Sequence, residues 1–509
     1  MAKSRLFVTL VRSLSNTASN GPKPFEDIPS LPGRGLPFLG HLLHLSKQPA
    51  GVKRMWENVD GLRKKYLKAD ELLLRLNLPP FNPLNGRVVI LFDPDDAKEV
   101  YAHEGKFPLR GPPFDAMLMM RDKRPDIYSE NRGLLLEDGE KWYNIRTKVQ
   151  QDLLRPKSAH FYLDSIQSVA QELVDIIRAE RTLESHEISD SVYCFKRYAF
   201  EAISLIALDT RLGCLKAEID PKTKETFEAF VKFSHSSVGL LFSVPTWRFL
   251  PPRWNKHYRQ GEDAQTILLD FNKHKVLEAI ERFKAKETDK ADHEKPVLEK
   301  LIKKLGHDST LPIVTAIEML VAGVDTTSNT LGMFLYHLAI NPDKQDKLRQ
   351  EFMSLGTNLT VKDLDKMKYF RACLQEHFRL IPVGPSTIRM VRDDCVIKGY
   401  QIPKDTVCLW FNSLFGRDAS IFENPEQFLP ERWLEKKKTF SPFAVRPFGH
   451  GPRMCIGKRF AELELQVATH KILTNFAVKW KNPGPLTYGF ALINQPDQKM
   501  HFQFEDLRK

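Results

Sequence analysis

A single cysteine stands in a glycine-rich loop near the C-terminal end of the chain. Residues 448–457 read FGHGPRMCIG, and Cys455 lies just ahead of a helix-like run from Lys458 to Leu465. A thiolate binds a metal ion strongly, and glycines without a Cβ let backbone N–H groups come close to a sulfur or to a flat ligand. Such hydrogen bonds steady the thiolate and tune the potential of an iron that it holds. Arg453 adds a permanent cation that suits a carboxylate on a cofactor.

Four interpretations of this cysteine compete. A lone cysteine is commonly a small buried hydrophobic residue. A zinc site needs several ligands, and neither a Cys-x-x-Cys pair nor a His-x-x-x-His pair accompanies Cys455. A nucleophilic cysteine needs a histidine base, for which His450 in the same loop is weak support. The interpretation that remains is a single axial thiolate for a haem iron.

The pattern Phe-x-x-Gly-x-Arg-x-Cys-x-Gly resembles the haem-binding loop of the cytochrome P-450 superfamily. The resemblance covers nearly the whole chain. It implies a mainly α fold with minor β structure, in one large haem-thiolate cytochrome P-450 unit over residues 26–509. It also implies a monooxygenase that incorporates molecular oxygen, with haem b (iron protoporphyrin IX) held by Cys455 as axial thiolate and with Phe448 opening the cofactor-binding loop.

A second motif, AGVDTT, occupies residues 322–327 within a long apolar segment. A glycine in a helix interior costs about 1 kcal/mol relative to alanine, so Gly323 needs a packing or functional reason. Thr326 is placed to bond the carbonyl of Ala322 and bend the helix locally. Taken alone, the hexapeptide favours threonine crowding or capping. Upstream of the cysteine loop, it resembles the oxygen-activating helix of the superfamily, and Asp325 and Thr326 match the acid–alcohol pair that relays protons to dioxygen there.

Glu376 and Arg379 lie three residues apart among apolar neighbours, so they share one face of a predicted helix. A buried pair of charges needs further partners to offset its desolvation, and Arg432 in the segment 428–433 is a candidate. Glu-x-x-Arg followed by Pro-Glu-Arg resembles the structural triad of the superfamily. The resemblance therefore gives these three residues a structural role on the haem side of the core, without chemistry of their own.

The two propionates of a haem need cations. Trp142 and Arg146 lie four residues apart on a predicted helix, and Arg389 follows the segment in which the family's chain returns to the haem edge. Each arginine alone is more commonly a solvated surface residue. At family positions, Trp142, Arg146, Arg389 and Arg453 are expected to bind the cofactor through charge-assisted hydrogen bonds and ring contacts.

The elements that must position these residues are mostly helical. Apolar periodicity and length predict long helices at 144–154, 161–180, 264–283, 311–340 and 364–380. Short β-branched or apolar runs predict strands at 87–92, 395–402 and 407–411. Neither an internal repeat nor a low-complexity linker divides the chain, which favours one mainly helical unit with minor β structure.

Composition narrows the classes of protein. The 42% of hydrophobic residues suffices for a large core, and the six cysteines show no pairing rhythm, which indicates a reducing compartment. The net charge of +12 fits an anionic membrane, an acidic protein partner or a merely well-solvated surface. We expect no nucleic-acid partner, because the lysines are spread along the chain and no compact nucleic-acid motif occurs.

The N-terminal stretch predicts a mitochondrial transit peptide over about residues 1–25. It contains arginines, lysines and serines and no acid before Glu26, and Leu6, Leu10 and Leu14 share one helix face. The apolar run 6–11 is too short to span a bilayer, which takes roughly 20 residues. These features favour a mitochondrial protein, and the resemblance implies that it is bound peripherally to the inner membrane on its matrix side.

Residues 139–142 (GEKW), Gln150 with Gln151, residues 399–403 (GYQIP) and the transit-like leader resemble the mitochondrial branch of the superfamily. Its members take electrons from an adrenodoxin-type ferredoxin served by an NADPH-dependent ferredoxin reductase. Lys458 and Arg459 after the cysteine loop and Arg371 on the predicted helix 364–380 are the expected basic docking residues. The chain departs from this branch at Gln375, where relatives often carry lysine. That departure affects how strongly the ferredoxin is expected to bind, and the docking surface is still expected to be basic.

The substrate is expected to be lipophilic. The segments that match the family's pocket are rich in apolar side chains and lie at 107–114, 242–254, 383–387 and 492–496. Phe242, Trp247, Phe249 and Trp254 form an aromatic group that also suits a membrane surface. The runs 124–128 and 492–497 resemble arthropod ecdysteroid side-chain hydroxylases, which implies a steroid hydroxylase of ecdysteroid biosynthesis. A xenobiotic-oxidising member of the same branch, a haem-thiolate isomerase or dehydratase, and a non-catalytic haem sensor remain alternatives.

Overall fold

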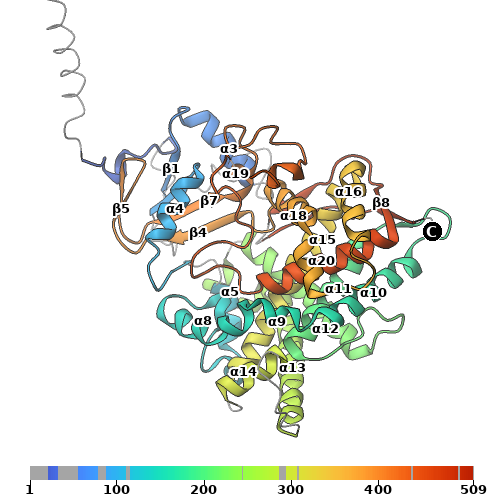
Figure 1. Cartoon of the computed structure of the whole chain (residues 1–509). Helices are drawn as coiled ribbons and strands as arrows, with labels where there is room; N and C mark the ends of the chain where they lie inside the picture. Colours follow the sequence, from blue (N-terminus) through green and yellow to red (C-terminus); the bar gives the residue numbers. More distant parts are fainter. Residues whose placement is uncertain are drawn as a thin grey trace, which may run out of the picture.

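A computed structural model describes residues 21–32, 55–77, 87–110, 115–242, 245–285, 294–306, 309–436, 439–490 and 493–507. Helices dominate these residues, and the strands gather in small sheets (Figure 1), which confirms the predicted fold class. Residues 1–20 of the predicted transit peptide lie outside the described residues. The packed chain reaches back at least to Lys23, whose N–H donates to Gly399 O at 2.8 Å, and Phe25 is buried. Residues before the predicted boundary at residue 25 are therefore already packed against the folded chain.

Helix α15 (Leu311–Ala339) runs through the centre of the helical part (Figure 1). It contacts α11 (Ser191–Leu208), α13 (Lys256–Ala285) and α20 (Lys458–Asn475). A helix that is apolar on all sides must be buried on all sides. It is long and apolar enough to cross a membrane, but 72% of its apolar window is buried inside the protein, so it serves as a core helix.

The predicted long helices form with small shifts at their ends. Helix α8 (Gly139–Leu154) covers the predicted segment 144–154, and α10 (Leu163–Glu180) covers all but the first two residues of the predicted segment 161–180. The segment predicted as one helix over 364–380 is two helices, α17 (Val361–Lys366) and α18 (Lys368–Leu380), separated at Met367. A capping box of Thr360 and Asp363 starts α17 before the predicted residue 364, and Met367, with φ of -68° and ψ of 65°, leaves the helical conformation between the two helices.

Further helices connect these elements. They are α3 (Met55–Tyr66), α4 (Pro94–Ala102), α5 (Asp115–Asp122), α6 (Pro125–Tyr128), α7 (Gly133–Leu136), α9 (Pro156–His160), α12 (Pro221–Phe242), α14 (Val297–Leu305), α16 (Pro342–Met353) and α19 (Asn412–Gly416), with 3₁₀ turns η1 (Phe25–Asp27), η3 (Thr246–Arg248), η4 (Pro252–Trp254) and η6 (Pro430–Trp433).

A four-stranded sheet lies apart from the α15 region, with α3 and α4 beside it (Figure 1). Its strand order is β1 (Leu73–Asn77), β2 (Arg87–Leu91), β7 (Val407–Phe411) and β4 (Ser386–Met390), and β2 and β7 run parallel while the other pairs are antiparallel. Successive side chains of β2 enter two different apolar clusters, as the pleat requires. The strands predicted at 87–92 and 407–411 are thereby confirmed.

The segment predicted as strand at 395–402 is a hairpin of β5 (Cys395–Ile397) and β6 (Tyr400–Ile402). Lys398 and Gly399 turn it with φ of 50° and 77°, the left-handed pair that suits a tight hairpin. The remaining strands are β3 (Glu187–Ile188), β8 (Phe476–Trp480) and β11 (Phe502–Asp506) in one sheet and β9 (Tyr488–Phe490) with β10 (Asn494–Pro496) in another.

Candidate active site

The cysteine loop is folded by its own backbone. The N–H of Cys455 donates to Phe448 O at 2.8 Å and that of Met454 to Gly451 O at 3.1 Å. Gly451 has a φ of +72°, and a Cβ at this position would overlap the buried carboxylate of Glu104. This glycine is therefore needed for close packing against Glu104, whereas the sequence suggested a close approach to a sulfur or a flat ligand. The loop delivers Cys455 to the start of α20.

The sulfur of Cys455 faces an internal cavity, which is why the residue has accessible surface although protein surrounds it. Burial raises the pKa of its thiol, and a hydrogen bond from the Gly457 backbone together with the Arg146 and Arg110 guanidinium groups opposes that rise. The expected N–H contact with the sulfur is thus present at Gly457. All six cysteines are described, and the other five are buried away from this cavity.

The cavity is lined mostly by apolar side chains from five helices and the cysteine loop. Helices α8, α11, α15 and α20 come from distant parts of the sequence (Figure 1), and side chains of all four line the cavity. The lining residues of these elements and of α7 include Leu134, Leu135, Trp142, Ile203, Met319, Ala322, Thr326, Phe460 and Glu464. A flat, largely apolar ligand with a metal for the thiolate fits such a lining.

Three arginines line one part of the cavity with too few anions to neutralise them. Burial and the like charges of neighbouring arginines lower the pKa of Arg453 to about 9, and burial lowers those of Arg110 and Arg146 to about 10. Arg453 donates from Nη2 to Asp138, but its Nε and Nη1 are buried without a hydrogen-bond partner. Its guanidinium lies 4.0 Å from the ring centre of Trp142. Buried, unpartnered N–H groups of this kind fit the carboxylates of a cofactor.

Arg110 was not among the predicted cofactor residues. It lies within the segment 107–114, which was chosen as a pocket segment because of its apolar side chains. A single arginine in an otherwise apolar pocket segment was the feature that could have identified Arg110 as a cofactor residue. Arg389 behaves differently from the prediction. Its Nε donates to Glu104 at 2.8 Å, and it is not among the described residues that line the cavity. A cofactor contact of Arg389 stays a prediction.

The acid and the alcohol of α15 point in different directions. Thr326 lines the cavity, and its Oγ1 donates to Ala322 O at 2.7 Å, as expected from the sequence. Asp325 is buried on another face, where it pairs with Lys196 Nζ at 2.9 Å and accepts a hydrogen bond from Ser234. The glycine one turn earlier has a packing reason, because a Cβ on Gly323 would lie 2.7 Å from Ile203 Cγ1.

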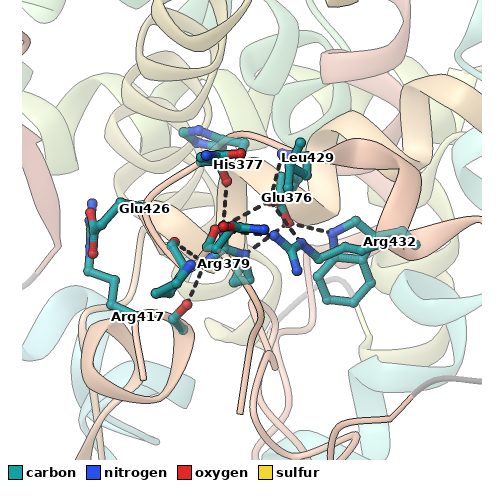
Figure 2. Close-up of polar contacts among 12 residues, drawn as sticks. Glu376, His377, Arg379, Arg417, Glu426, Leu429 and Arg432 are labelled. Atoms are coloured by element: carbon teal, nitrogen blue, oxygen red, sulfur yellow. Dashed lines mark hydrogen bonds and ion pairs between the residues drawn. The ribbon is translucent and has the colours of Figure 1, made fainter. Parts of the chain in front are cut away.

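The predicted structural triad is assembled. Figure 2 shows the Glu376 carboxylate accepting hydrogen bonds from Arg379, from Arg432 Nε at 3.1 Å and from the Leu429 N–H at 2.8 Å. Trp433 Nε1 adds a fourth donor at 2.8 Å. Glu376 and Arg379 are completely buried, and Arg379 also donates to three backbone carbonyls. This network joins α18 to the segment that follows α19.

Glu464 on α20 is a further acid in the cavity wall that sequence reasoning missed. It is buried, its Oε2 has no hydrogen-bond partner, and the Thr327 hydroxyl is its polar neighbour. Burial raises its pKa to about 8. Glu464 is therefore a neutral carboxylic acid near pH 7. The one signal in the sequence was its place on the predicted helix that directly follows Cys455.

We expect Glu464→Gln to stabilise the protein more at pH 8 than at pH 5.5. The folded state keeps a proton that the unfolded state, with the ordinary glutamate pKa, has lost. Stability therefore falls as pH rises from about 5 to 8, by up to about 1.4 kcal/mol per pH unit. Denaturation midpoints at both pH values measure the effect, with the half-exposed Glu462→Gln on the same helix as control. An equal gain at both pH values would contradict the assignment.

The predicted docking residues lie behind the cysteine loop. Lys458 and Arg371 line one surface groove with Lys368 and Arg446, and the described residues of its lining contain no acid. Arg459 lines an adjacent groove, and Arg371 and Phe448 line both. Arg371 is already engaged, because its guanidinium donates to the carbonyls of Leu364 and Asp365. Phe448 thus lies on the surface side of the loop, against Phe378, and does not line the cavity.

A helical fold whose internal cavity presents one cysteine sulfur, buried arginines and an apolar wall is that of a haem-thiolate protein. The cytochrome P450 family model matches residues 29–501, and the chain belongs to this family. It is 32% identical to probable cytochrome P450 12a5, mitochondrial, of Drosophila melanogaster, over 95% of this chain and 91% of the relative.

Two further relatives agree. Cytochrome P450 CYP12A2 of Musca domestica is 34% identical over 82% of this chain and 81% of its own, and probable cytochrome P450 12b2, mitochondrial, of Drosophila melanogaster is 31% identical over 82% and 79%. The resemblance to the cytochrome P-450 superfamily is confirmed, whereas the resemblance to ecdysteroid side-chain hydroxylases stays a prediction. The chain is a cytochrome P450 monooxygenase with a haem held by a cysteine thiolate, and two of these three relatives are named mitochondrial. The names of these three relatives state no substrate.

Proposed function

We propose that this monooxygenase works in mitochondria, bound peripherally at the matrix side of the inner membrane, and hydroxylates a lipophilic, sterol-like molecule with electrons from a ferredoxin. The observation that carries the proposal is the cavity that unites the Cys455 sulfur, Thr326 and unpartnered arginine N–H groups within a mostly apolar wall. The mitochondrial names of two relatives and the predicted leader support the location.

Cys455 is the proposed axial ligand, because it is the cysteine of the cavity wall. Arg453, with two free buried N–H groups, and Arg146 and Arg110 are the proposed partners of the propionates. Trp142 holds the Arg453 guanidinium against its ring and so fixes its direction. When bound, haem supplies the activation of dioxygen and the insertion of one oxygen atom into a C–H bond.

The proposed proton path uses the two sides of α15. Asp325 meets Lys196 and Ser234, away from the cavity, whereas Thr326 holds its hydroxyl in the cavity. Asp325 takes up protons on its own side and must turn away from Lys196 to pass them toward Thr326. The back-bond from Thr326 to Ala322 O occupies a carbonyl of the helix ladder, and this permits local bending there.

We expect Asp325→Asn to lower product-forming turnover by about 10²-fold, the scale of a general acid–base group. Thr326→Val should instead keep NADPH consumption while product per NADPH falls by about tenfold, because the hydroxyl in the cavity is lost. The ratio of product to NADPH, in water and in deuterium oxide, measures both effects. Thr330→Val is the control, since Thr330 makes the same back-bond, to Thr326 O at 2.6 Å, without lining the cavity. Unchanged coupling in Thr326→Val would remove Thr326 from the path.

The electron donor is proposed to be an acidic adrenodoxin-type ferredoxin that docks on the groove of Lys368, Arg371, Arg446 and Lys458. This groove carries four cations and no acid among its described lining residues, so it attracts an acidic surface. Its floor includes Phe448, whose carbonyl accepts the Cys455 N–H. The groove thus lies directly behind the thiolate.

We expect Lys368→Glu with Lys458→Glu to weaken ferredoxin binding at least about tenfold at low salt and to flatten its salt dependence. These lysines are preferable to Arg371, whose replacement would also remove hydrogen bonds to α17. Two control charge reversals, Lys222→Glu and Lys224→Glu on α12, should leave binding unchanged. Equal affinity and an equal salt slope in the groove variant would remove this groove as the docking site.

The turns between α12 and α13 suit a membrane surface better than a pocket wall. Trp247 is buried, but Phe249, Leu250 and Trp254 are 83%, 48% and 73% exposed. The side chain of Phe242 lies outside the described residues. Exposed large apolar side chains on neighbouring turns insert into the acyl boundary of a bilayer. Co-sedimentation with anionic vesicles, with and without Phe249→Ser and Trp254→Ser, measures this contact.

A substrate screen tests the proposed function as a whole. Purified holoenzyme is titrated with sterols, ecdysteroid precursors and xenobiotics, and binders are turned over with ferredoxin, its reductase and NADPH, with mass spectrometry of the products. Hydroxylation of an ecdysteroid precursor would support the steroid proposal. Oxidation of xenobiotics alone would replace it by the detoxifying alternative. Rearrangement or dehydration of a binder without NADPH would indicate an isomerase or dehydratase, and ligand binding with no turnover would indicate a haem sensor.

A further inference from the structure

Glu318 is a buried carboxylate in the cavity wall, two helical turns before Thr326 on α15. It accepts a hydrogen bond from Arg121 Nη1 at 2.8 Å, from the Leu134 N–H at 2.6 Å and from the Leu135 N–H at 3.1 Å. Both carboxylate oxygens are therefore occupied by donors of this chain. Their bonds connect the core helix to two backbone positions of α7.

The backbone of α7 is shaped to receive this carboxylate. Gly133 has a φ of +79°, and a Cβ at this position would overlap the Glu318 carboxylate. Only glycine combines that conformation with that contact. The next two residues, Leu134 and Leu135, line the cavity. Glu318 thus holds a short piece of apolar wall by its main chain.

Arg121 extends the same connection to α5 and α6. It is buried, its guanidinium lies 4.9 Å from the ring centre of Tyr128, and it also donates to Arg132 O. Loss of one partner from a buried ion pair leaves the other charge uncompensated. One carboxylate therefore ties α5, α6 and α7 to α15.

The outer side of α5 and α6 is held by weaker contacts. Lys123 pairs with Glu262 of α13, and Arg124 pairs with Asp270 of α13 at 2.7 Å. One partner in each pair is about half exposed or more, and exposed pairs of this kind contribute little. The internal bonds to Glu318 therefore dominate the placement of the wall.

We propose that Glu318 is a positioning residue for the substrate: its carboxylate fixes Leu134 and Leu135 at one side of the cavity and so sets which substrate carbon lies near Thr326. The inference rests on the proposed function, in which haem and substrate share this cavity. Because its oxygens are occupied by Arg121 and two backbone N–H groups, Glu318 acts through α7 and does not recognise a polar or cationic group of the substrate.

Glu318→Gln tests the proposal on the full-length holoenzyme. The amide keeps the size of the side chain but loses the charge that faces Arg121 and one of the two acceptor oxygens. Amide hydrogen exchange in the peptide 133–136 should accelerate about tenfold or more, with exchange in α20 unchanged. The dissociation constant of an identified substrate should rise about tenfold, and its single product should become a mixture of positional isomers. Unchanged exchange at Leu134 and Leu135, or an unchanged product, would overturn the proposal.

Gly133→Ala breaks the same contact without altering any charge. Its matched control is Gly356→Ala, because Gly356 has nearly the same φ, +81°, and open space at its Cβ. Gly133→Ala should reproduce the faster exchange at Leu134 and Leu135 and the mixed product, whereas Gly356→Ala should show neither. Identical behaviour of the two variants would overturn the proposal.

The double variant Glu318→Gln with Arg121→Met covers the case in which Glu318→Gln alone folds poorly. Removing the uncompensated charge should restore the melting temperature while the exchange at Leu134 and Leu135 stays fast. A slow, native-like exchange in this variant would contradict the proposal. Failure of the proposed function is distinguishable, because it would show as a lack of haem binding or turnover in the unmodified enzyme, whereas hydrogen exchange reports on α7 in either case.

Discussion

Cys455→Ser is expected to abolish monooxygenase activity and the red-shifted absorption band that a thiolate ligand confers on the carbon monoxide complex of the haem. Cys455 is the cysteine that lines the cavity, and the Gly457 N–H, Arg146 and Arg110 all favour its anionic form. A serine hydroxyl at this position donates much less electron density to iron than a thiolate does. The electron donation that favours cleavage of the O–O bond is therefore lost.

The measurements are the carbon monoxide difference spectrum and product formation with ferredoxin and its reductase. Cys395→Ser provides a matched control, since Cys395 is a buried cysteine of β5 outside the cavity, and its variant should retain both signals. A thiolate-type spectrum in Cys455→Ser would show that another cysteine binds the iron. That result would overturn the whole assignment of the site.

Glu376→Gln is expected to have the largest effect on folding, with a loss of about 3–5 kcal/mol of stability. The carboxylate accepts hydrogen bonds from Arg379, Arg432 and the Leu429 backbone (Figure 2) and from Trp433. The side chains of Glu376 and Arg379 have no exposed surface. The amide would leave the Arg379 charge buried without a counter-ion. A cost of this size is a large share of the stability of an ordinary domain.

Denaturant unfolding and the yield of haem-loaded protein measure this loss. Glu431→Gln is the control, because Glu431 belongs to the same region and pairs with Lys344 and Lys347, but its side chain is 40% exposed. Surface pairs contribute about 1 kcal/mol or less, so the control should remain folded. An equal loss of unfolding free energy in the two variants would show that the cost of Glu376→Gln does not come from the burial of the triad.

Helices and strands were predicted correctly where the residues of a single segment determine its conformation. The apolar run of α15 predicted a helix over 311–340 that ends within one residue of the observed Ala339, because its length and hydrophobicity leave few alternatives. The short runs of β2 and β7 predicted strands, for the same reason. The early start of α17 was also a local feature, since Thr360 and Asp363 match the capping-box pattern in the sequence, whereas no such pattern marked the break at Met367.

By itself, the sequence determined the fold class and singled out Cys455 and Thr326, which the structure places in the cavity wall, and the three residues of the buried triad. These predictions rest on residue types and their spacing within one segment, or on the order in which the motifs of the family follow one another along the chain. Only the tertiary structure decided that Asp325 faces Lys196, that Arg389 pairs with Glu104, and that Gly451 makes room for a carboxylate. It alone brought Arg110, Glu318 and Glu464 to the cavity. The physical reason is that burial, pairing and therefore protonation depend on which segments pack together, and spacing along one chain does not contain those contacts.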